Sequence, residues 1–394
     1  MNKMIRNIRL LNIIYALKWF VLMLPVTVLY FKQHNLSGRE IFTLTSCYSL
    51  SIVLFEVPSG YIADLKGRKK SIIAGLALSV IGNLFFLLPG FYFFAVAEIL
   101  LGIGASFISG CDSALFYDSL KNLKKENKFK KLIGRYRAYG NFSEAGAGLI
   151  GGFLASYALV FTVYGRLTVL LAGLIISFFI TEPEREIIQT HKGRIITLLK
   201  VVKYSFADNK TVKWLIFFSS VLGAATLNIA WFSQFFFKEI NLSPIYFGVV
   251  WAIIQVASGL YAGFGHRYTD LLGKHKAMAS LMLFIFAGYI GLAFSGNIFI
   301  GIAFILICFA VRGINLPVLG FYLHKEVDSD KRATVISVKS LSVRLFYSSL
   351  APFFGYIIDN RGLRLSLIVA GSVYAVFGTI AFLALVKVMK WKRI

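Results

Sequence analysis

The chain has 394 residues, of which 58% are hydrophobic and 16% aromatic, while only 15% carry a charge. This balance excludes an ordinary soluble domain and is typical of a protein that crosses a membrane several times. The net charge of +24 does not indicate nucleic-acid binding, because the cations lie in short segments between apolar runs and form no single basic face.

The apolar runs predict twelve membrane-spanning helices, since roughly 20 apolar residues cross the hydrocarbon core of a bilayer. In chain order the predicted spans are residues 8–31, 40–63, 71–89, 92–117, 136–158, 164–181, 211–237, 244–266, 276–295, 298–323, 333–357 and 363–387. The first run is too long for a cleaved signal and has no small-residue cleavage site. We therefore predict an all-α membrane protein.

A charged segment divides the predicted helices into two sets of six. Residues 182–210 mix charges with apolar residues in a pattern that predicts a cytosolic linker with one amphipathic helix at the membrane surface. The expected domains are an N-terminal six-helix bundle at 1–181, this linker, and a C-terminal six-helix bundle at 211–394.

The distribution of Lys and Arg predicts a multi-pass protein of the cell (inner) membrane with both termini in the cytosol. Of the 42 Lys and Arg residues, four fall within predicted helices and most of the others lie in loops on the cytosolic side. The cations assigned to the outer side are Lys32, Arg39, Arg166, Lys238, Arg361 and Arg364.

The two halves repeat each other without gaps. Residues 31–37, Phe-Lys-Gln-His-Asn-Leu-Ser, match residues 237–243, Phe-Lys-Glu-Ile-Asn-Leu-Ser, at an offset of 206. The same offset carries Asp64 and Gly67 onto Asp270 and Gly273. Two loops and the helix between them thus keep register, as expected for a transporter built from two like halves.

Residues 60–70 read Gly-Tyr-Ile-Ala-Asp-Leu-Lys-Gly-Arg-Lys-Lys between two apolar runs. Because Asp, Lys and Arg are unfavourable in lipid, this segment is expected to be a short water-facing turn. Its spacing resembles the loop signature of the major facilitator superfamily of secondary transporters, and the resemblance in architecture covers nearly the whole chain. It implies that helices 1, 4, 7 and 10 line a central cavity.

The resemblance also implies a cytosolic latch. Asp64 is expected to meet the N-terminal end of helix 11, where an anion is stabilised, and Arg68 to pair with Asp118. The alternative is that the cations of this loop only set topology. The predicted gating residues are Gly60, Asp64, Gly67, Arg68, Asp118 and Asp270.

Two further helices resemble family patterns but depart from them. In the fourth span, Glu98 stands where the family has an arginine linked to proton movement, so that role is not carried over. In the fifth span, Gly148 replaces the proline and Ser143 the first glycine of the antiporter pattern, which weakens the case for an exporter. The Gly-x-Gly-x-x-Gly at 146–151 lies within a predicted membrane helix, so it indicates close helix packing and no dinucleotide site.

Ionisable residues inside membrane helices are candidate functional residues, because their insertion is unfavourable. They are Lys18, Glu56, Glu98, Asp112, Glu144, Arg312, Lys339 and Arg344. The predicted substrate contacts are Lys18, Asp112, Arg312, Asn228, Trp231 and Gln234, with Tyr15, Trp19 and Phe107 as further aromatic walls. Asp112, Glu144 and Glu98 are the candidate proton carriers, although Glu98 is equally expected to be solvated near a helix end; Glu56 is assigned to structural pairing.

No cofactor or metal site is expected. Cys47, Cys111 and Cys308 fall in apolar runs as packing residues, and none of the five His residues has metal or triad spacing. An intramembrane enzyme or a solute sensor is a possible alternative class, but the sequence lacks clustered catalytic groups and an appended signalling domain.

The sequence therefore predicts a proton-coupled secondary transporter that moves a small, partly apolar organic solute by alternating access, with export as the leading direction. The alternative is uptake of an organic anion or metal chelate, because several cations lie within helices. The expected partners are the solute, protons and the lipid bilayer, without nucleic acid, and the family resemblance implies a monomer.

Overall fold

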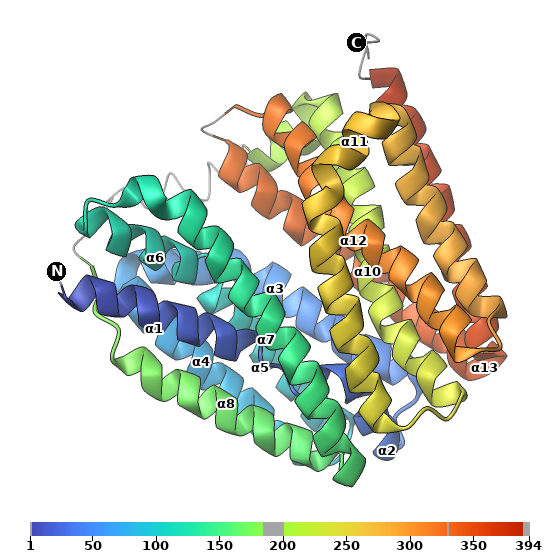
Figure 1. Cartoon of the computed structure of the whole chain (residues 1–394), viewed down its shortest axis with the longest axis horizontal. Coiled ribbons are helices and arrows are strands. Elements are labelled where there is room, and N and C mark those ends of the chain that lie inside the picture. The colour runs from blue at the N-terminus through green and yellow to red at the C-terminus, as the bar shows by residue number, and fades with distance from the viewer. Residues whose placement is uncertain (1, 184–200, 329–330, 389–394) are drawn as a thin grey trace. The chain divides into compact units, whose positions relative to one another are not determined.

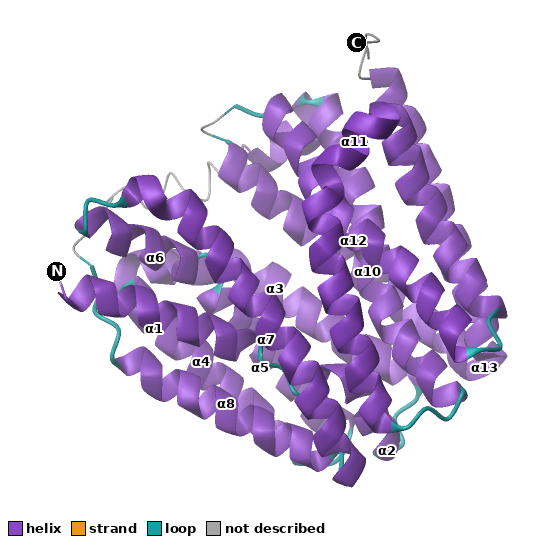
Figure 2. Cartoon of the chain, viewed as in Figure 1, coloured by secondary structure: helices purple, strands orange, loops and turns teal. Residues whose placement is uncertain are grey.

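The structure is a computed structural model that describes residues 2–183, 201–328 and 331–388, and in these ranges it contains helices and no strand (Figure 2). The elements are α1 (Asn2–Trp19), η1 (Leu24–Val26), α2 (Thr27–Gln33), α3 (Gly38–Lys66), α4 (Arg68–Phe85), α5 (Phe91–Ile108), α6 (Cys111–Asn122), η2 (Glu126–Lys128), α7 (Phe129–Tyr157), α8 (Val160–Phe178), η3 (Tyr204–Asp208), α10 (Lys210–Glu239), α11 (Pro244–Phe294), α12 (Ile298–Glu326) and α13 (Arg332–Val388).

Nine helical segments in the described ranges are long and apolar enough to cross a membrane. Each of the twelve predicted spans overlaps a described helix, and α11 and α13 each carry two spans that meet at a glycine, Gly273 and Gly362. These findings confirm the all-α membrane class. The predicted amphipathic linker helix falls largely on residues 184–200, which lie outside the described residues.

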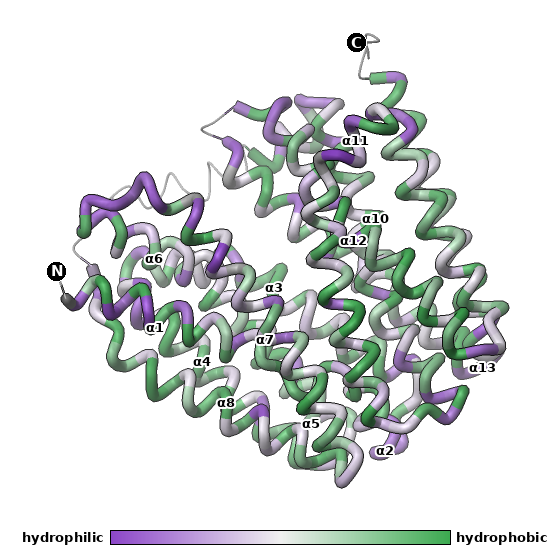
Figure 3. Tube along the Cα trace, in the orientation of Figure 1, coloured by the Kyte–Doolittle hydropathy of each residue, from purple (hydrophilic) through white to green (hydrophobic). Residues whose placement is uncertain are grey.

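The chain forms two compact units. Unit 1 contains the residues up to Ile187 together with Asn241–Val256, and unit 2 contains Ile188–Ile240 and the residues from Ala257 onward. In unit 1, α1 packs against α7 and α8, while α4 and α3 pack against α5 (Figure 1). Apolar residues run along these helices, and hydrophilic residues gather around the connection between α6 and α7 (Figure 3). In unit 2, α10 packs against both α12 and α13.

The predicted internal repeat is confirmed in local backbone geometry. Asn35 and Asn241 both have a positive φ, of 60° and 53°, and each lies three residues before the start of the next helix, α3 and α11 respectively. Gly67 and Gly273 both have a positive φ, of 105° and 71°. Because a side chain is strongly disfavoured at such angles, the glycine of the loop signature is required in both halves.

Two predicted helices are interrupted, which corrects the sequence-based expectation of continuous spans. The first span ends as α1 at Trp19 and resumes beyond the short turn η1, where Pro25 provides no N–H for a helix hydrogen bond. The fourth span ends as α5 at Ile108 and resumes as α6 after Gly110, whose φ is 73°. Both interruptions occur in unit 1 within segments long enough to span a membrane.

Small residues hold the helices of unit 1 close together, as predicted for the fifth span. A Cβ on Gly151 of α7 would collide with the carbonyl of Leu22, in the interruption of the first span. Gly75 of α4 and Gly104 of α5 similarly face each other's carbonyl groups. Close packing at Gly151 therefore positions the interrupted segment that carries the site described next.

Candidate functional site in unit 1

Lys18 and Asp112 meet where the two helices are interrupted. The Nζ atom of Lys18, in the last turn of α1, lies 3.6 Å from Oδ2 of Asp112, in the first turn of α6. Their side chains are only 23% and 11% exposed. A cation at a helix C-terminus and an anion at a helix N-terminus are each stabilised by the helix dipole. The helix ends thus favour both charged forms at this position.

Aromatic side chains surround this ion pair. The Nζ atom of Lys18 lies 5.9 Å from the ring centre of Tyr15, which contacts the ring of Tyr136 at a centroid distance of 3.9 Å. Trp19 approaches Tyr15 edge-on at 6.2 Å. A cation held against an aromatic ring gains further stabilisation. Of the predicted aromatic walls, Trp19 lines the cavity described next, whereas Tyr15 and Phe107 do not, and a contact of any of them with substrate stays a prediction.

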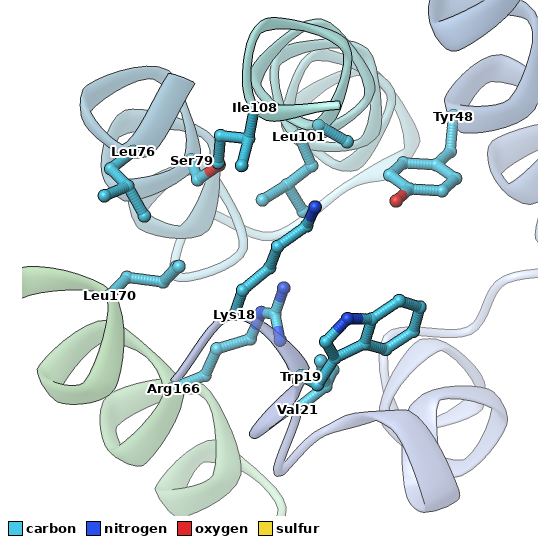
Figure 4. A pocket seen from close by; sticks show the side chains of 11 residues that line it. Lys18, Trp19, Val21, Tyr48, Leu76, Ser79, Leu101, Ile108, Arg166 and Leu170 are labelled. Carbon is cyan, nitrogen blue, oxygen red and sulfur yellow. The ribbon is translucent and has the colours of Figure 1, made fainter. Parts of the chain in front are cut away.

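A cavity of about 100 Å³ opens beside this pair. It is lined by Lys18, Trp19, Val21, Tyr48, Leu76, Ser79, Leu101, Ala105, Ile108, Arg166 and Leu170, from α1, α3, α4, α5 and α8 and the interruption after α1. Figure 4 shows Lys18 and Arg166 in the middle of the view, with Trp19 and Tyr48 on one side and Leu76 and Leu170 on the other. The cavity combines apolar walls with two cations, as expected for a site that binds a partly apolar solute.

The charge count placed Arg166 among the cations of the outer side, whereas the structure places it on the wall of this cavity. It lies two turns inside α8, is half-buried and lines the cavity. Apolar residues flank Arg166 on both sides of this segment. This was the signal that would have identified it as an intramembrane cation.

Glu98 lies on the cavity-facing side of α5. It precedes Leu101, Ala105 and Ile108, which line the cavity, at helical spacings of three, seven and ten residues. The Glu98 side chain is buried, and the charge of opposite sign that acts on it is that of Arg166. The alternative of solvation near a helix end is therefore wrong for this residue.

The other predicted contacts lie elsewhere. Glu144 is buried in α7 and does not line the cavity of unit 1.

In unit 2, the amide of Asn228 is fully buried and donates a hydrogen bond to the hydroxyl of Tyr374, while Gln234 is also buried. The guanidinium of Arg312 lies 5.6 Å from the ring centre of Phe309. The Nδ2 group of Asn228 is thus engaged within unit 2. Substrate contacts at Asn228, Gln234, Arg312 and the half-buried Trp231 stay predictions.

The loop that follows α3 contains the expected ion pair. The guanidinium of Arg68 forms a direct salt bridge with Asp118 of α6, as the family resemblance implied. Asp64 lies in the last turn of α3, Gly60 lies one turn earlier, and Asp270 occupies the repeated position in α11. The contact between Arg68 and Asp118 is confirmed, whereas a gating role for these residues stays a prediction.

An acid that was not predicted from the sequence, Glu182, caps the N-terminus of α4. The carboxylate of Glu182 accepts hydrogen bonds from the backbone N–H groups of Arg68 and Lys69, at 2.9 and 2.7 Å. The side-chain amide of Asn7 in α1 makes two hydrogen bonds to the backbone of the neighbouring Thr181. It donates to the carbonyl of Thr181 and accepts from the N–H of Thr181. Thr181 and Glu182, which follow α8, are therefore hydrogen-bonded both to α1 and to the start of α4 in the loop signature at residues 60–70.

Two smaller predictions concern structural residues. Oε1 of Glu56 accepts a hydrogen bond from the hydroxyl of Ser109, in the interruption between α5 and α6, which agrees with structural pairing. Cys111 and Cys308 are buried and all three cysteines are free, as predicted for packing residues. Within the described ranges, no cluster of His, Cys, Asp and Glu forms a metal site.

Comparisons with known proteins point to one family. A family profile described as "Major Facilitator Superfamily" matches residues 10–345. The "Uncharacterized MFS-type transporter YceJ" of Bacillus subtilis is 23% identical over 82% of this chain and 81% of its own length. The "Tetracycline resistance protein, class H" of Pasteurella multocida is 23% identical over 87% and 86%, and the "Drug efflux pump JefA" of Mycobacterium tuberculosis is 30% identical over 27% and 21%.

Solved structures share the fold. The nucleoside transporter NupG superimposes over 100% of both chains with a TM-score of 0.78 at 15% identity. A bacterial homologue of the human lysosomal transporter Spinster, in an inward-facing and unoccupied conformation, superimposes over 100% of this chain and 99% of its own with a TM-score of 0.76 at 16% identity.

Proposed function

We propose that this chain, which belongs to the Major Facilitator Superfamily, is a proton-coupled transporter that exports a small, partly apolar organic solute by alternating access. The observation that carries the proposal is the ion pair of Lys18 and Asp112 beside the cavity of unit 1. The ion pair joins the end of α1 to the start of α6, so loss of the charge on either side chain weakens the contact between these two helices.

Asp112 is the proposed site of proton exchange. When its carboxylate takes a proton, the attraction to Lys18 is lost, and the ends of α1 and α6 are free to separate. When the proton leaves, the pair reforms and draws these ends together. A proton that crosses the membrane contributes about 2.3 kcal/mol per 100 mV of membrane potential, which far exceeds the thermal energy and is enough to drive a solute against a gradient.

The names of similar proteins support export as the direction. Two of the relatives are described as a drug efflux pump and a tetracycline resistance protein. The aliphatic and aromatic walls of the cavity suit an apolar solute of that kind. On the cytosolic side, the proposed latch consists of Asp64, Arg68 and Asp118, with Gly67 at the turn. We also propose that both termini lie in the cytosol and that the protein acts as a monomer in the cell membrane.

Transport by purified protein in liposomes tests the proposal. An exporter that exchanges solute for protons should accumulate tetracycline in these liposomes when their interior is acidic, because protons then leave as tetracycline enters. Asp112→Asn should abolish this accumulation. The matched control is Asp328→Asn, which neutralises an acid whose side chain is 72% exposed. Equal accumulation without a pH gradient, or by Asp112→Asn, would contradict the proposal.

Uptake of an organic anion together with a proton is the second candidate function. The specific observation in its favour is that the lining of the cavity contains two basic side chains, Lys18 and Arg166, and no acidic one. The direction of the pH gradient that drives accumulation distinguishes export by proton exchange from uptake of an anion together with a proton. A symporter of anion and proton accumulates its solute in vesicles with an alkaline interior, the reverse of the gradient that drives an exporter by exchange.

A further inference from the structure

The cavity of unit 1 presents positive charge to a molecule that enters it. Lys18 of α1 and Arg166 of α8 both line the cavity, and Figure 4 shows both side chains in the middle of the view. No acidic residue is among the lining residues. The carboxylate of Asp112 contacts Lys18 but is not part of the lining, so it balances only one of the two cations. A bound monoanion would balance the other.

The contact between Lys18 and Asp112 is an ion pair without a short hydrogen bond. An ammonium group has three N–H donors, and the 3.6 Å between Nζ and Oδ2 is longer than a hydrogen bond to nitrogen. The other oxygen of Asp112, Oδ1, accepts a hydrogen bond from the backbone N–H of Ser113. Asp112 therefore balances the charge of Lys18 without using its donors, which a carboxylate in the cavity can reach.

The size of the cavity limits the length of the ligand. Its volume of about 100 Å³ is smaller than the roughly 150 Å³ of an engineered protein cavity that binds benzene. Leu76, Leu101 and Ile108 provide apolar walls, and Tyr48 and Ser79 add hydroxyl groups. This lining suits a short aliphatic body that carries a single anionic group.

From this geometry we infer that the cavity of unit 1 binds a short-chain organic monoanion between Lys18 and Arg166, and that Asp112 competes with this anion for Lys18. Without the anion, Asp112 is the counter-ion of Lys18. When the anion binds, its carboxylate reaches the same ammonium at hydrogen-bond distance, and two negative charges then oppose each other across Lys18. This inference rests on the transport function proposed above and names a substrate class for its second candidate. It concerns binding, so it is tested without transport.

Three probes of nearly equal shape test the charge preference: butyrate, butyramide and butylamine. They are titrated at pH 7 into the purified full-length protein in detergent, and calorimetry measures their affinities. Butyrate should bind about tenfold or more tightly than butyramide, the ratio expected for one charge-assisted hydrogen bond, and butylamine should bind most weakly. Equal affinities for butyrate and butyramide would overturn the inference.

A second series varies the length of the apolar body. From acetate to butyrate, the affinity should rise about fourfold for each added methylene group, because the apolar walls remove that group from water. Octanoate has a chain too long for a cavity of this volume and should bind no more tightly than butyrate. A steady gain in affinity through to octanoate would place the ligand outside the cavity and overturn the inference.

Variants of the two cations locate the anion, once a cooperative thermal transition has shown that each variant is folded. Arg166→Gln and Lys18→Met should each weaken butyrate binding about tenfold or more, whereas Lys18→Arg should retain part of the affinity. The matched control is Arg135→Gln, which removes an exposed cation of α7 and should change nothing. If Arg166→Gln and Lys18→Met both bind butyrate as tightly as the natural protein, the inference is wrong.

Removal of the competing acid should have the opposite effect. Asp112→Asn should tighten butyrate binding about tenfold, because the anion then becomes the counter-ion of a poorly exposed cation. This gain should disappear when Asp112→Asn is combined with Lys18→Met, since no ammonium is left to compete for. Asp328→Asn, which neutralises an acid whose side chain is 72% exposed, should have no effect. Weaker or unchanged binding by Asp112→Asn would overturn the inference.

Two outcomes distinguish this inference from the function itself. Transport driven by a pH gradient, in a protein that binds butyrate and butyramide equally, would overturn the inference and leave the transporter intact. Preferential butyrate binding that tightens in Asp112→Asn, in a protein that moves no solute under either pH gradient, would support the site and contradict the proposed function.

Discussion

Lys18 at the C-terminal end of α1 and Asp112 at the N-terminal end of α6 hold each other across two interrupted helices, with 3.6 Å between Nζ and Oδ2. Each charge also lies at the helix end that favours its sign. The two residues are 94 positions apart in the chain, so the ion pair is a long-range contact between α1 and α6.

A double-mutant cycle on this pair should show coupling. Lys18→Met and Asp112→Asn should each destabilise the protein, because either change leaves the opposite charge poorly exposed to water and without its partner. The double variant should lose less than the sum of the two, by about 0.5–3 kcal/mol. Thermal unfolding in detergent measures the differences. If the stability losses of the two single variants simply add in the double variant, the interaction between Lys18 and Asp112 contributes nothing to stability.

Removal of the Glu182 carboxylate should loosen the start of α4. Glu182→Ala deprives the N–H groups of Arg68 and Lys69 of their acceptors, at a loss of about 0.3–2 kcal/mol for an anion at a helix N-terminus. Hydrogen exchange of residues 67–71 should become faster. Glu126→Ala, which removes an exposed acid in η2, is the control. Unchanged exchange in Glu182→Ala would show that water replaces the carboxylate fully.

The two glycines of the signature loop should respond in opposite ways to substitution. Gly67→Ala forces a side chain into a backbone conformation at φ 105°, which is unfavourable by about 1–3 kcal/mol. Gly60→Ala places a methyl group in open space within α3 and should be neutral or stabilise the helix by up to about 1 kcal/mol. Thermal unfolding of both variants measures whether their stabilities change in these opposite directions. If Gly60→Ala keeps full stability but loses transport, its predicted gating role is supported.

A second glycine pair on α7 tests how the interrupted first span is positioned. Gly151→Ala would bring a methyl group into the carbonyl of Leu22 and should destabilise the protein by about 1–3 kcal/mol through overpacking. Gly146→Ala meets only Phe20 at an ordinary distance of 3.9 Å. That variant should be at least as stable as the natural protein. Equal melting temperatures for the two variants would mean that the segment around Leu22 moves aside at no cost.

The sequence was sufficient for the helical membrane class and for the matching loops of the two halves, since hydrophobic length and loop motifs are local properties. It also indicated the partner of Arg68, through family resemblance. The interruptions at Pro25 and Gly110 were missed because hydropathy is continuous across them, although a proline and a glycine were visible there.

Arg166 was missed for a different physical reason. Cation counting assigns residues near predicted helix ends to one side of the membrane, and α8 begins four residues before the predicted span. The engagement of Asn228 with Tyr374 could not be predicted either, because it depends on packing between α10 and α13. The grouping of Arg312 with Lys18 spans both units and stays a prediction.

The two interrupted spans have a consequence for water. A helix that stops within a bilayer leaves backbone amide and carbonyl groups that hydrocarbon does not satisfy, and such backbone is tolerated only where it is buried in protein or hydrated. Several backbone groups of the two interruptions are bonded within the protein, such as the N–H of Ser109 to the carbonyl of Ala105. Because the ends of α1 and α6 lie beside the cavity, we expect water there to satisfy the terminal groups that no protein group reaches. A solute that enters there exchanges places with these waters, and its affinity depends on how well its own polar atoms reproduce the hydrogen bonds it displaces.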